Sequence, residues 1–274
     1  MKLKDALKNE FTEQELNLLV RGYDVVGDIA ITIIPPELEA KESIIGNTIL
    51  RLQKNVKVVA KRHGNYGGEL RTIPLVIIAG ENRKETEYKE HGVRFCLNPE
   101  KVYFSVRSSN ERKRLASLVK SDEDILVMFS GIGAFPLVIA QNSSAGKIVG
   151  IEKNPYAHTY AAKNLARNKK IKNVTFLEGD VVDVMPTLSM KFDRIAMPLP
   201  KTAEIFLARA LRSLKQSGWL HFYDFQQEGN FADSVEKITI ACAENNRSFI
   251  QAQTFVCGHC SPRTYRVCVD AQIA

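Results

Sequence analysis

The chain has 274 residues, 45% of them apolar and 25% charged, which is typical of a globular protein with room for one large and one small domain. No apolar run approaches the ~20 residues that span a bilayer, and the N-terminus lacks the apolar core of an export signal, so we exclude a membrane protein and expect a cytoplasmic one. With 38 Lys and Arg against 31 Asp and Glu, the net charge of +7 favours a polyanionic partner.

Residues 1–105 predict a small α+β domain. Apolar residues at helical spacing indicate a helix over residues 1–20, in which Thr12 is a cap for a second piece. Residues 23–34 suggest a strand pair or one bulged strand, ended by Pro35 and Pro36; Pro36 also suits the first turn of a helix that runs to about residue 53. Further short strands are expected at residues 56–60, 75–79 and 93–97.

Residues 106–274 predict a larger α/β domain. A basic helix near residues 112–119 is followed by alternating strands and helices up to the end of the chain. Strands are expected near 125–129, 147–151, 174–177, 193–197, 218–223, 249–256 and 265–270, and helices near 134–142, 155–168, 202–215 and 229–245. Interleaved helices and a closing antiparallel pair of strands indicate a doubly wound, Rossmann-like sheet of the class I methyltransferase type.

The most informative segment is residues 124–135, Asp-Ile-Leu-Val-Met-Phe-Ser-Gly-Ile-Gly-Ala-Phe. It predicts a buried strand, a tight turn at Gly131 and Gly133, and the start of a helix. Glycines let the backbone approach a ligand closely at the positive end of the helix. A lone Gly-x-Gly is more often an ordinary turn, and where a dinucleotide fingerprint has its third glycine this chain has Pro136.

Two acidic residues, one after each of the next two strands, favour S-adenosylmethionine over a nicotinamide cofactor. Glu152 follows the next strand, about 20 residues past the turn, where a carboxylate binds a ribose diol. Asp180 follows the strand after that, and is expected at the adenine amine. Because ligands of open α/β sheets bind beyond the carboxyl ends of the strands, the expected cofactor-binding residues are Phe129, Gly131, Gly133, Phe135, Glu152, Lys153, Asp180, Val181 and Met197.

The segment Met197-Pro-Leu-Pro200 occupies the place where amino-methylating enzymes of this class present carbonyls to a nitrogen of a base. Its second residue, Pro198, has neither a polar side chain nor a backbone N–H, so a rigid turn that caps the strand explains it equally well. Upstream, Arg107 precedes the sheet and could stabilise negative charge on a purine O6. An isolated arginine is more often a surface charge or a phosphate contact.

The cysteines do not predict a metal site. Their number is five, and without an export signal we expect reduced thiols. Cys257-Gly-His-Cys260 is the one suggestive cluster, but four zinc ligands would require His221 and Cys268 from other strands. We interpret it as small residues between two strands and expect no metal.

Several segments in order resemble the archaeal and eukaryotic tRNA guanine-37 N1-methyltransferase family, from about residue 21 to the end. They are Gly27-Asp-Ile-Ala-Ile31, Pro36-Glu-Leu38, His91-Gly-Val-Arg-Phe95, Val102-Tyr-Phe-Ser-Val-Arg107, Glu111-Arg112, Met128-Phe-Ser-Gly-Ile-Gly-Ala-Phe135, Glu152-Lys-Asn-Pro-Tyr156, Met197-Pro-Leu-Pro-Lys201 and Ser261-Pro-Arg-Thr-Tyr265. The resemblance implies a small RNA-facing domain, a Rossmann-like catalytic domain, and transfer of methyl from S-adenosylmethionine to N1 of guanosine 37 in the anticodon loop of tRNA.

The resemblance also assigns roles to residues. Arg107 matches the family's catalytic arginine, and Glu152 serves either the ribose or removal of the N1 proton; with Pro198 beside the flipped base, these are the expected catalytic residues. The residues expected to contact RNA are Arg107, Lys163, Arg167, Lys169, Lys170, Lys201 and Arg263. We expect a monomer.

Two departures from the family pattern qualify this expectation. Many members begin with a further small domain that checks the outer corner of tRNA; because Gly27 lies so near the start of this sequence, we expect that domain to be missing. Most members have Asn-Leu-Pro where this chain has Pro198-Leu-Pro200; the proline form resembles a variant archaeal branch that also methylates C7 of the tricyclic wyosine precursor at position 37. Two alternatives stay open: the related aminocarboxypropyl transferase of the wybutosine pathway, and a non-catalytic RNA-binding module.

Overall fold

The computed structural model describes residues 2–64 and 67–274, which fold into two compact units. The first unit comprises Met1–Lys89 and Arg94–Val106, and the second comprises Glu90–Val93 and Arg107–Ala274. In the part of the chain that is described, no helix is long and apolar enough to cross a membrane.

The first unit is a small α+β fold. Its sheet has the order β1 (Asp24–Val26), β2 (Ile29–Thr32), β3 (Val58–Arg62) and β4 (Leu75–Gly80). The helices are α1 (Leu3–Ala6), α2 (Glu13–Leu18), η1 (Pro36–Lys41) and α3 (Glu42–Leu52), and β5 (Thr86–Glu90) pairs with β6 (Val93–Leu97) as a separate two-stranded sheet. Leucines and isoleucines of α1 to α3 pack with Ala30, Val59 and Ile78 into one apolar cluster.

Local capping explains why the first helix is interrupted. The Thr12 hydroxyl accepts from the backbone N–H of Glu15, and the Glu15 carboxylate accepts from the backbone N–H of Thr12. This reciprocal pair begins a new helix at Glu13, so residues 1–20 form two short helices with the second starting after Thr12 as expected.

The second unit contains a seven-stranded sheet with the order β12-β13-β11-β10-β7-β8-β9. Its strands are β7 (Ile125–Val127), β8 (Ile148–Glu152), β9 (Val174–Glu178), β10 (Phe192–Met197), β11 (Leu214–Gln227), β12 (Phe249–Ser261) and β13 (Thr264–Ile273). Strands β7 to β11 are parallel, and β13 is antiparallel to both of its neighbours. The predicted closing antiparallel pair is confirmed.

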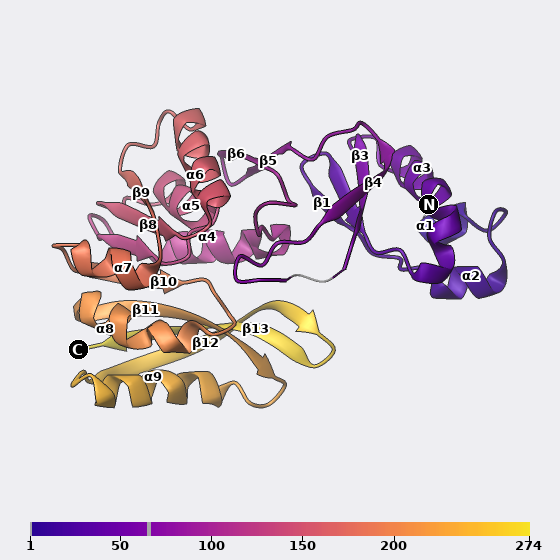
Figure 1. Cartoon of the computed structure of the whole chain (residues 1–274). Helices are drawn as coiled ribbons and strands as arrows, with labels where there is room; N and C mark the ends of the chain where they lie inside the picture. Colours follow the sequence, from indigo (N-terminus) through magenta and orange to yellow (C-terminus); the bar gives the residue numbers. More distant parts are fainter. Residues whose placement is uncertain (1, 65–66) are drawn as a thin grey trace. The chain divides into compact units, whose positions relative to one another are not determined.

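Helices cover both faces of this sheet. Figure 1 shows α4 (Ser109–Leu118), α5 (Ala134–Asn142) and α6 (Pro155–Arg167) on one face. Side chains of α7 (Val181–Val184), η3 (Met185–Thr187), η4 (Ala203–Phe206), α8 (Leu207–Ser213) and α9 (Ala232–Glu244) pack on the other face in one apolar core with the strands. The doubly wound architecture predicted from the alternating pattern is therefore present.

The order of the strands reverses between β7 and β10. From β7 the chain builds outward through β8 and β9, then returns to place β10 on the other side of β7, with Leu126 opposite Ile195 and Val127 opposite Ala196. In open α/β sheets, ligands bind at such a switch point, outside the carboxyl ends of the strands. The glycine turn follows β7 and Met197 ends β10, so both predicted ligand segments lie at this edge.

Candidate active site

The turn after β7 has a backbone that few side chains tolerate. Phe129, Gly131 and Gly133 all have positive φ, at 59°, 58° and 83°. Gly133 is the N-cap of α5, and a Cβ atom added there would lie 2.6 Å from the Phe176 ring. The glycines thus leave a flat backbone surface at the start of α5, and the left-handed conformation of Phe129 is strain of the kind found at ligand sites.

Glu152, the last residue of β8, is held by backbone donors of the turn. Its carboxylate oxygens accept from the N–H of Gly131 at 2.6 Å and of Asn154 at 2.7 Å. Burial raises the pKa of Glu152, while the hydrogen bonds from Asn154, Gly131 and Lys153 act in the opposite direction. A carboxylate can accept at about four positions, so these donors orient the group and leave acceptor capacity for a diol.

Asp180 lies two residues after the end of β9 and caps α7. One carboxylate oxygen accepts from the N–H of Val182 at 2.8 Å, and the other is 2.9 Å from the Lys153 ammonium. The hydrogen bond from Lys153 is the main reason that the pKa of Asp180 is lowered. Lys153 directly follows Glu152, and the N–H of Gly179 donates to the carbonyl of Glu152, so the two predicted acids are close neighbours.

The Pro-Leu-Pro loop, residues 198–200, leads from β10 towards the glycine turn. The N–H of Leu199 donates to the carbonyl of Met197 at 2.8 Å, which closes a tight turn around Pro198. The loop continues into η4, whose Phe206 ring lies 5.1 Å from the Phe129 ring. The sequence predicted both segments, and the ring contact shows that the structure brings them together.

Three of the predicted cofactor-binding side chains are buried. Met197 and Val181 belong to the apolar core that the helices share with the strands. Phe135 is also buried, and its ring lies 5.7 Å from the Tyr223 ring, between α5 and β11. These three side chains therefore pack inside the protein, whereas Glu152, Lys153 and Asp180 are at least partly accessible.

Arg107 and the predicted RNA-contacting residues lie on the surface. Arg107 is exposed in η2 (Val106–Ser108), directly before α4. The remaining candidates are likewise exposed: Lys163 and Arg167 on α6, Lys169 and Lys170 just after it, Lys201 beyond the Pro-Leu-Pro loop, and Arg263 between β12 and β13. Exposure suits contacts to a large polyanion and is also the ordinary state of charged side chains.

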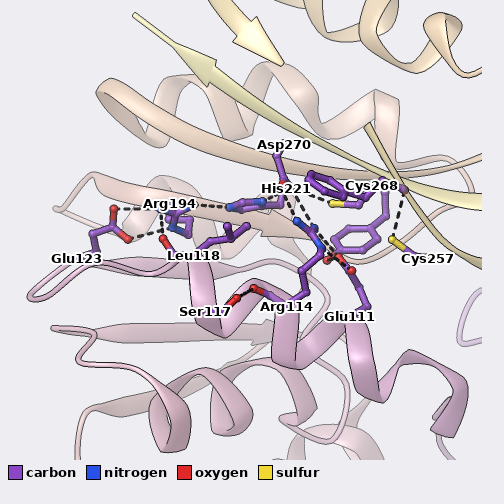
Figure 2. Close-up of polar contacts among 12 residues, drawn as sticks. Glu111, Arg114, Ser117, Leu118, Glu123, Arg194, His221, Cys257, Cys268 and Asp270 are labelled. Atoms are coloured by element: carbon purple, nitrogen blue, oxygen red, sulfur yellow. Dashed lines mark hydrogen bonds and ion pairs between the residues drawn. The ribbon is translucent and has the colours of Figure 1, made fainter. Parts of the chain in front are cut away.

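Sequence reasoning missed a buried polar network that joins α4 to the sheet. Figure 2 shows Arg114, Asp270, His221 and Arg194 in a line of hydrogen bonds. The signal available was an ionisable residue directly beside buried apolar ones in each strand: Arg194 before Ile195, His221 between Leu220 and Phe222, and Asp270 between Val269 and Ala271. Only the fold reveals that these residues meet.

Among the residues described, one group combines three potential metal ligands: His221, Cys268 and Asp270. Both ring nitrogens of His221 already have partners, Arg194 on one side and Asp270 on the other. The Cys257-Gly-His-Cys260 cluster lies in β12, within the strand and not in the turn that follows it. This corrects its expected place between two strands.

The strand order, the glycine turn after the first strand of the sheet, and the acids after the next two define a class I, Rossmann-like methyltransferase. More narrowly, the chain belongs to the TRM5/TYW2 family. Residues 86–250 match the model of the TRM5/TYW2 methyltransferase domain, and residues 3–83 match the TYW2 N-terminal domain.

Named relatives agree with this assignment. The tRNA (guanine(37)-N(1))-methyltransferase Trm5b of Pyrococcus abyssi is 34% identical over 95% of this chain and 78% of its own length. The tRNA 4-demethylwyosine(37)-methyltransferase Taw21 of Saccharolobus solfataricus is also 34% identical, over 91% of this chain and 93% of its own. The solved complex of aTrm5 and tRNALeu is 27% identical with a TM-score of 0.84, and the match covers all of this chain and 78% of that one.

Proposed function

We propose that the chain transfers methyl from S-adenosylmethionine to N1 of guanosine 37 in tRNA, and that C7 of the tricyclic wyosine precursor at position 37 is a second acceptor. The observation that carries the proposal is the Glu152 carboxylate bound to the N–H of Gly131 at the switch point. That geometry lies in a chain 34% identical to relatives named for each of the two reactions.

The residues present fit the cofactor. The left-handed glycines provide a backbone surface that a Cβ at Gly133 would obstruct, and Glu152 is already oriented for a ribose diol. The carboxylate of Asp180 can accept a hydrogen bond from an adenine amine, either beside its hydrogen bond from Lys153 or after Lys153 moves away. When bound, the cofactor supplies an electrophilic methyl group on a sulfonium.

The chain's own residues then position the acceptor. Catalysis of such an in-line transfer comes mostly from placement, so the rigidity of the Pro-Leu-Pro loop matters. Pro198 fixes φ and offers no N–H, which leaves loop carbonyls as the polar groups that face a base. Arg107 stabilises negative charge on the purine O6 as the N1 proton leaves. We assign Glu152 to the ribose because backbone donors already fix its carboxylate.

Affinity for tRNA comes from phosphate contacts by exposed cations. They are Arg107, Lys163, Arg167, Lys169, Lys170, Lys201 and Arg263, together with the small domain. Each neutralised phosphate releases counterions, so binding weakens steeply as salt is raised. We further propose that the chain acts as a monomer in the cytoplasm, where its five free cysteines would stay reduced.

The test is methyl transfer from labelled S-adenosylmethionine to unmodified tRNA, followed by nucleoside analysis of position 37. N1-methylguanosine supports the main reaction, and the same assay on precursor-containing tRNA tests the second acceptor. Because residues 3–83 match the TYW2 N-terminal domain, cofactor labelled in its aminocarboxypropyl group must be tried in parallel. Incorporation of that label alone would identify the transferase alternative, and absence of cofactor binding would favour a non-catalytic RNA-binding module.

A further inference from the structure

Helix α4 connects the residue proposed to act on the base with the interior of the sheet. Arg107 lies in η2, and α4 begins two residues later at Ser109. The direction in which Arg107 enters the site therefore depends on how α4 is fixed. Two residues of its first turns, Glu111 and Arg112, are buried although charged, which is costly unless each is paired.

The start of α4 is fixed by two sets of polar contacts. Arg112 makes a two-point ion pair with Glu90, at 2.5 and 2.7 Å, and both side chains are 3% exposed. Glu111 accepts from the Tyr223 hydroxyl at 2.7 Å and from Arg114 at 2.7 Å. The fork geometry of an arginine bound to a carboxylate at two points restricts orientation as well as distance.

From Arg114 the contacts continue across the sheet (Figure 2). Arg114 reaches Asp270 on β13 at 2.5 and 3.2 Å. Asp270 in turn is 2.5 Å from the Nδ1 atom of His221 on β11. The Nε2 atom of His221 lies 2.8 Å from the guanidinium of Arg194, which also binds Glu123 at 3.0 and 3.1 Å.

The hydrogen bonds specify one protonation state for the row of side chains from Arg114 to Arg194. Arg194 can only donate, so the Nε2 atom of His221 accepts and its Nδ1–H donates to Asp270. Burial lowers the pKa of His221, which keeps the ring neutral. Burial alone would raise the pKa of Asp270, but hydrogen bonds from His221 and Arg114 bring it well below its ordinary value. The ionised form of Asp270 is thus stabilised by Arg114 and His221.

Arg194 connects α4, the helix that follows Arg107, with β10, the strand that leads into the Pro-Leu-Pro loop. Its guanidinium donates to the carbonyl of Leu118, the last residue of α4, at 2.9 Å. Arg194 is also a residue of β10, three positions before Met197, after which the Pro-Leu-Pro loop starts. The network therefore joins α4 to β10 directly at Leu118, and through Asp270 and His221 it also joins Arg114, in the middle of the helix, to Arg194.

We propose that Arg114, Asp270 and Arg194 are positioning residues, which fix the position of Arg107 relative to the Pro-Leu-Pro loop. They touch neither base nor cofactor and act through α4 and β10. The inference rests on the proposed function, since it assigns them a role in transfer to position 37. A metal site at His221, Cys268 and Asp270 is disfavoured, because two arginines point positive charge into that group.

The test is a double-mutant cycle between Asp270→Asn and Arg107→Ala, measured as kcat on tRNA under saturating cofactor. If Asp270 acts through Arg107, Asp270→Asn lowers kcat by about tenfold or more in the wild-type background and by less than about twofold beside Arg107→Ala. The dissociation constant for S-adenosylmethionine stays within about twofold throughout. Arg114→Lys, which keeps the charge but loses the fork, should fall between wild type and Asp270→Asn.

Asp193→Asn is the matched control. Asp193 neighbours Arg194 on β10 and also loses an ion pair, with Lys215, but none of its contacts reaches α4, so kcat should stay within about twofold. Equal losses from Asp270→Asn in both backgrounds, with folded protein, would overturn the inference, as would an unchanged kcat. If Asp270→Asn does not fold, the cycle is run with Arg114→Lys. A wild-type chain that transfers no methyl to tRNA refutes the proposed function itself.

Discussion

Replacing Glu152 with Gln tests the centre of the proposed cofactor site. The substitution keeps size and shape but turns one acceptor oxygen into an amide donor. The two backbone N–H groups of Gly131 and Asn154, now bound at 2.6 and 2.7 Å, cannot then both be satisfied. An unsatisfied buried donor costs about 1–3 kcal/mol, so the free energy of unfolding should fall by about that amount.

The same change should weaken cofactor binding. A hydrogen bond between a ribose hydroxyl and a charged acceptor contributes about 1.5–3 kcal/mol, which corresponds to a rise of roughly 10- to 150-fold in the dissociation constant for S-adenosylmethionine. Calorimetric titration gives that constant, and urea unfolding gives the stability. Glu178→Gln is the matched control, because Glu178 lies opposite Glu152 on β9 and is exposed.

The reasoning fails if Glu152→Gln binds the cofactor as tightly as the wild type and is equally stable. Reduced stability with unchanged affinity would make Glu152 a structural clamp of the turn. Reduced kcat with unchanged affinity, and a shifted acid limb in the pH profile, would instead support the base role for the N1 proton.

Three further results are expected. Gly133→Ala should lower the free energy of unfolding by more than about 1 kcal/mol and weaken cofactor binding, since φ is 83° and the new Cβ would meet the Phe176 ring; tolerance by both measures would contradict the described turn. His221 has a lowered pKa when folded, so below about pH 6.5 the unfolded chain binds a proton that the native chain does not, and stability should fall by up to about 1.4 kcal/mol per pH unit on acidification. His221→Gln should remove that part of the slope in urea unfolding, and an unaltered slope would assign it to other groups. Replacing both Lys169 and Lys170 with Gln should reduce the slope of log affinity for tRNA against log salt by up to about two, measured by filter binding, and an identical slope would remove these lysines from the interface.

The elements that the sequence predicted well are those whose boundaries have local causes. Helix α5 covers residues 134–142 as expected, because Gly133 in the left-handed conformation starts it. The strand ends that place Glu152, Asp180 and Met197 were also predicted, since short apolar runs ended by turn residues define them. Together with the resemblance, these local patterns indicated the fold, the cofactor and the family.

Elements that depend on distant partners were predicted less well. Strand β11 runs over Leu214–Gln227, beyond the expected residues 218–223, because it pairs with β13 along Gly218 to Gln227 and with Phe192 of β10 at Leu214. Strand β5, whose sequence is largely polar, was missed, and it exists through its pairing with β6. Pairing energy between segments far apart in the chain outweighs weak local preference in these cases.

The sequence by itself thus determined the order of strands and helices, the glycine turn, and the acids that follow β8 and β9, because each is set by residues within a few positions of one another. Only the tertiary structure decided which polar residues meet. Arg114, His221 and Asp270 are separated in sequence and lie next to one another because two strands and a helix pack together. Buried charges require partners, and which partners are available is decided by packing rather than by local pattern.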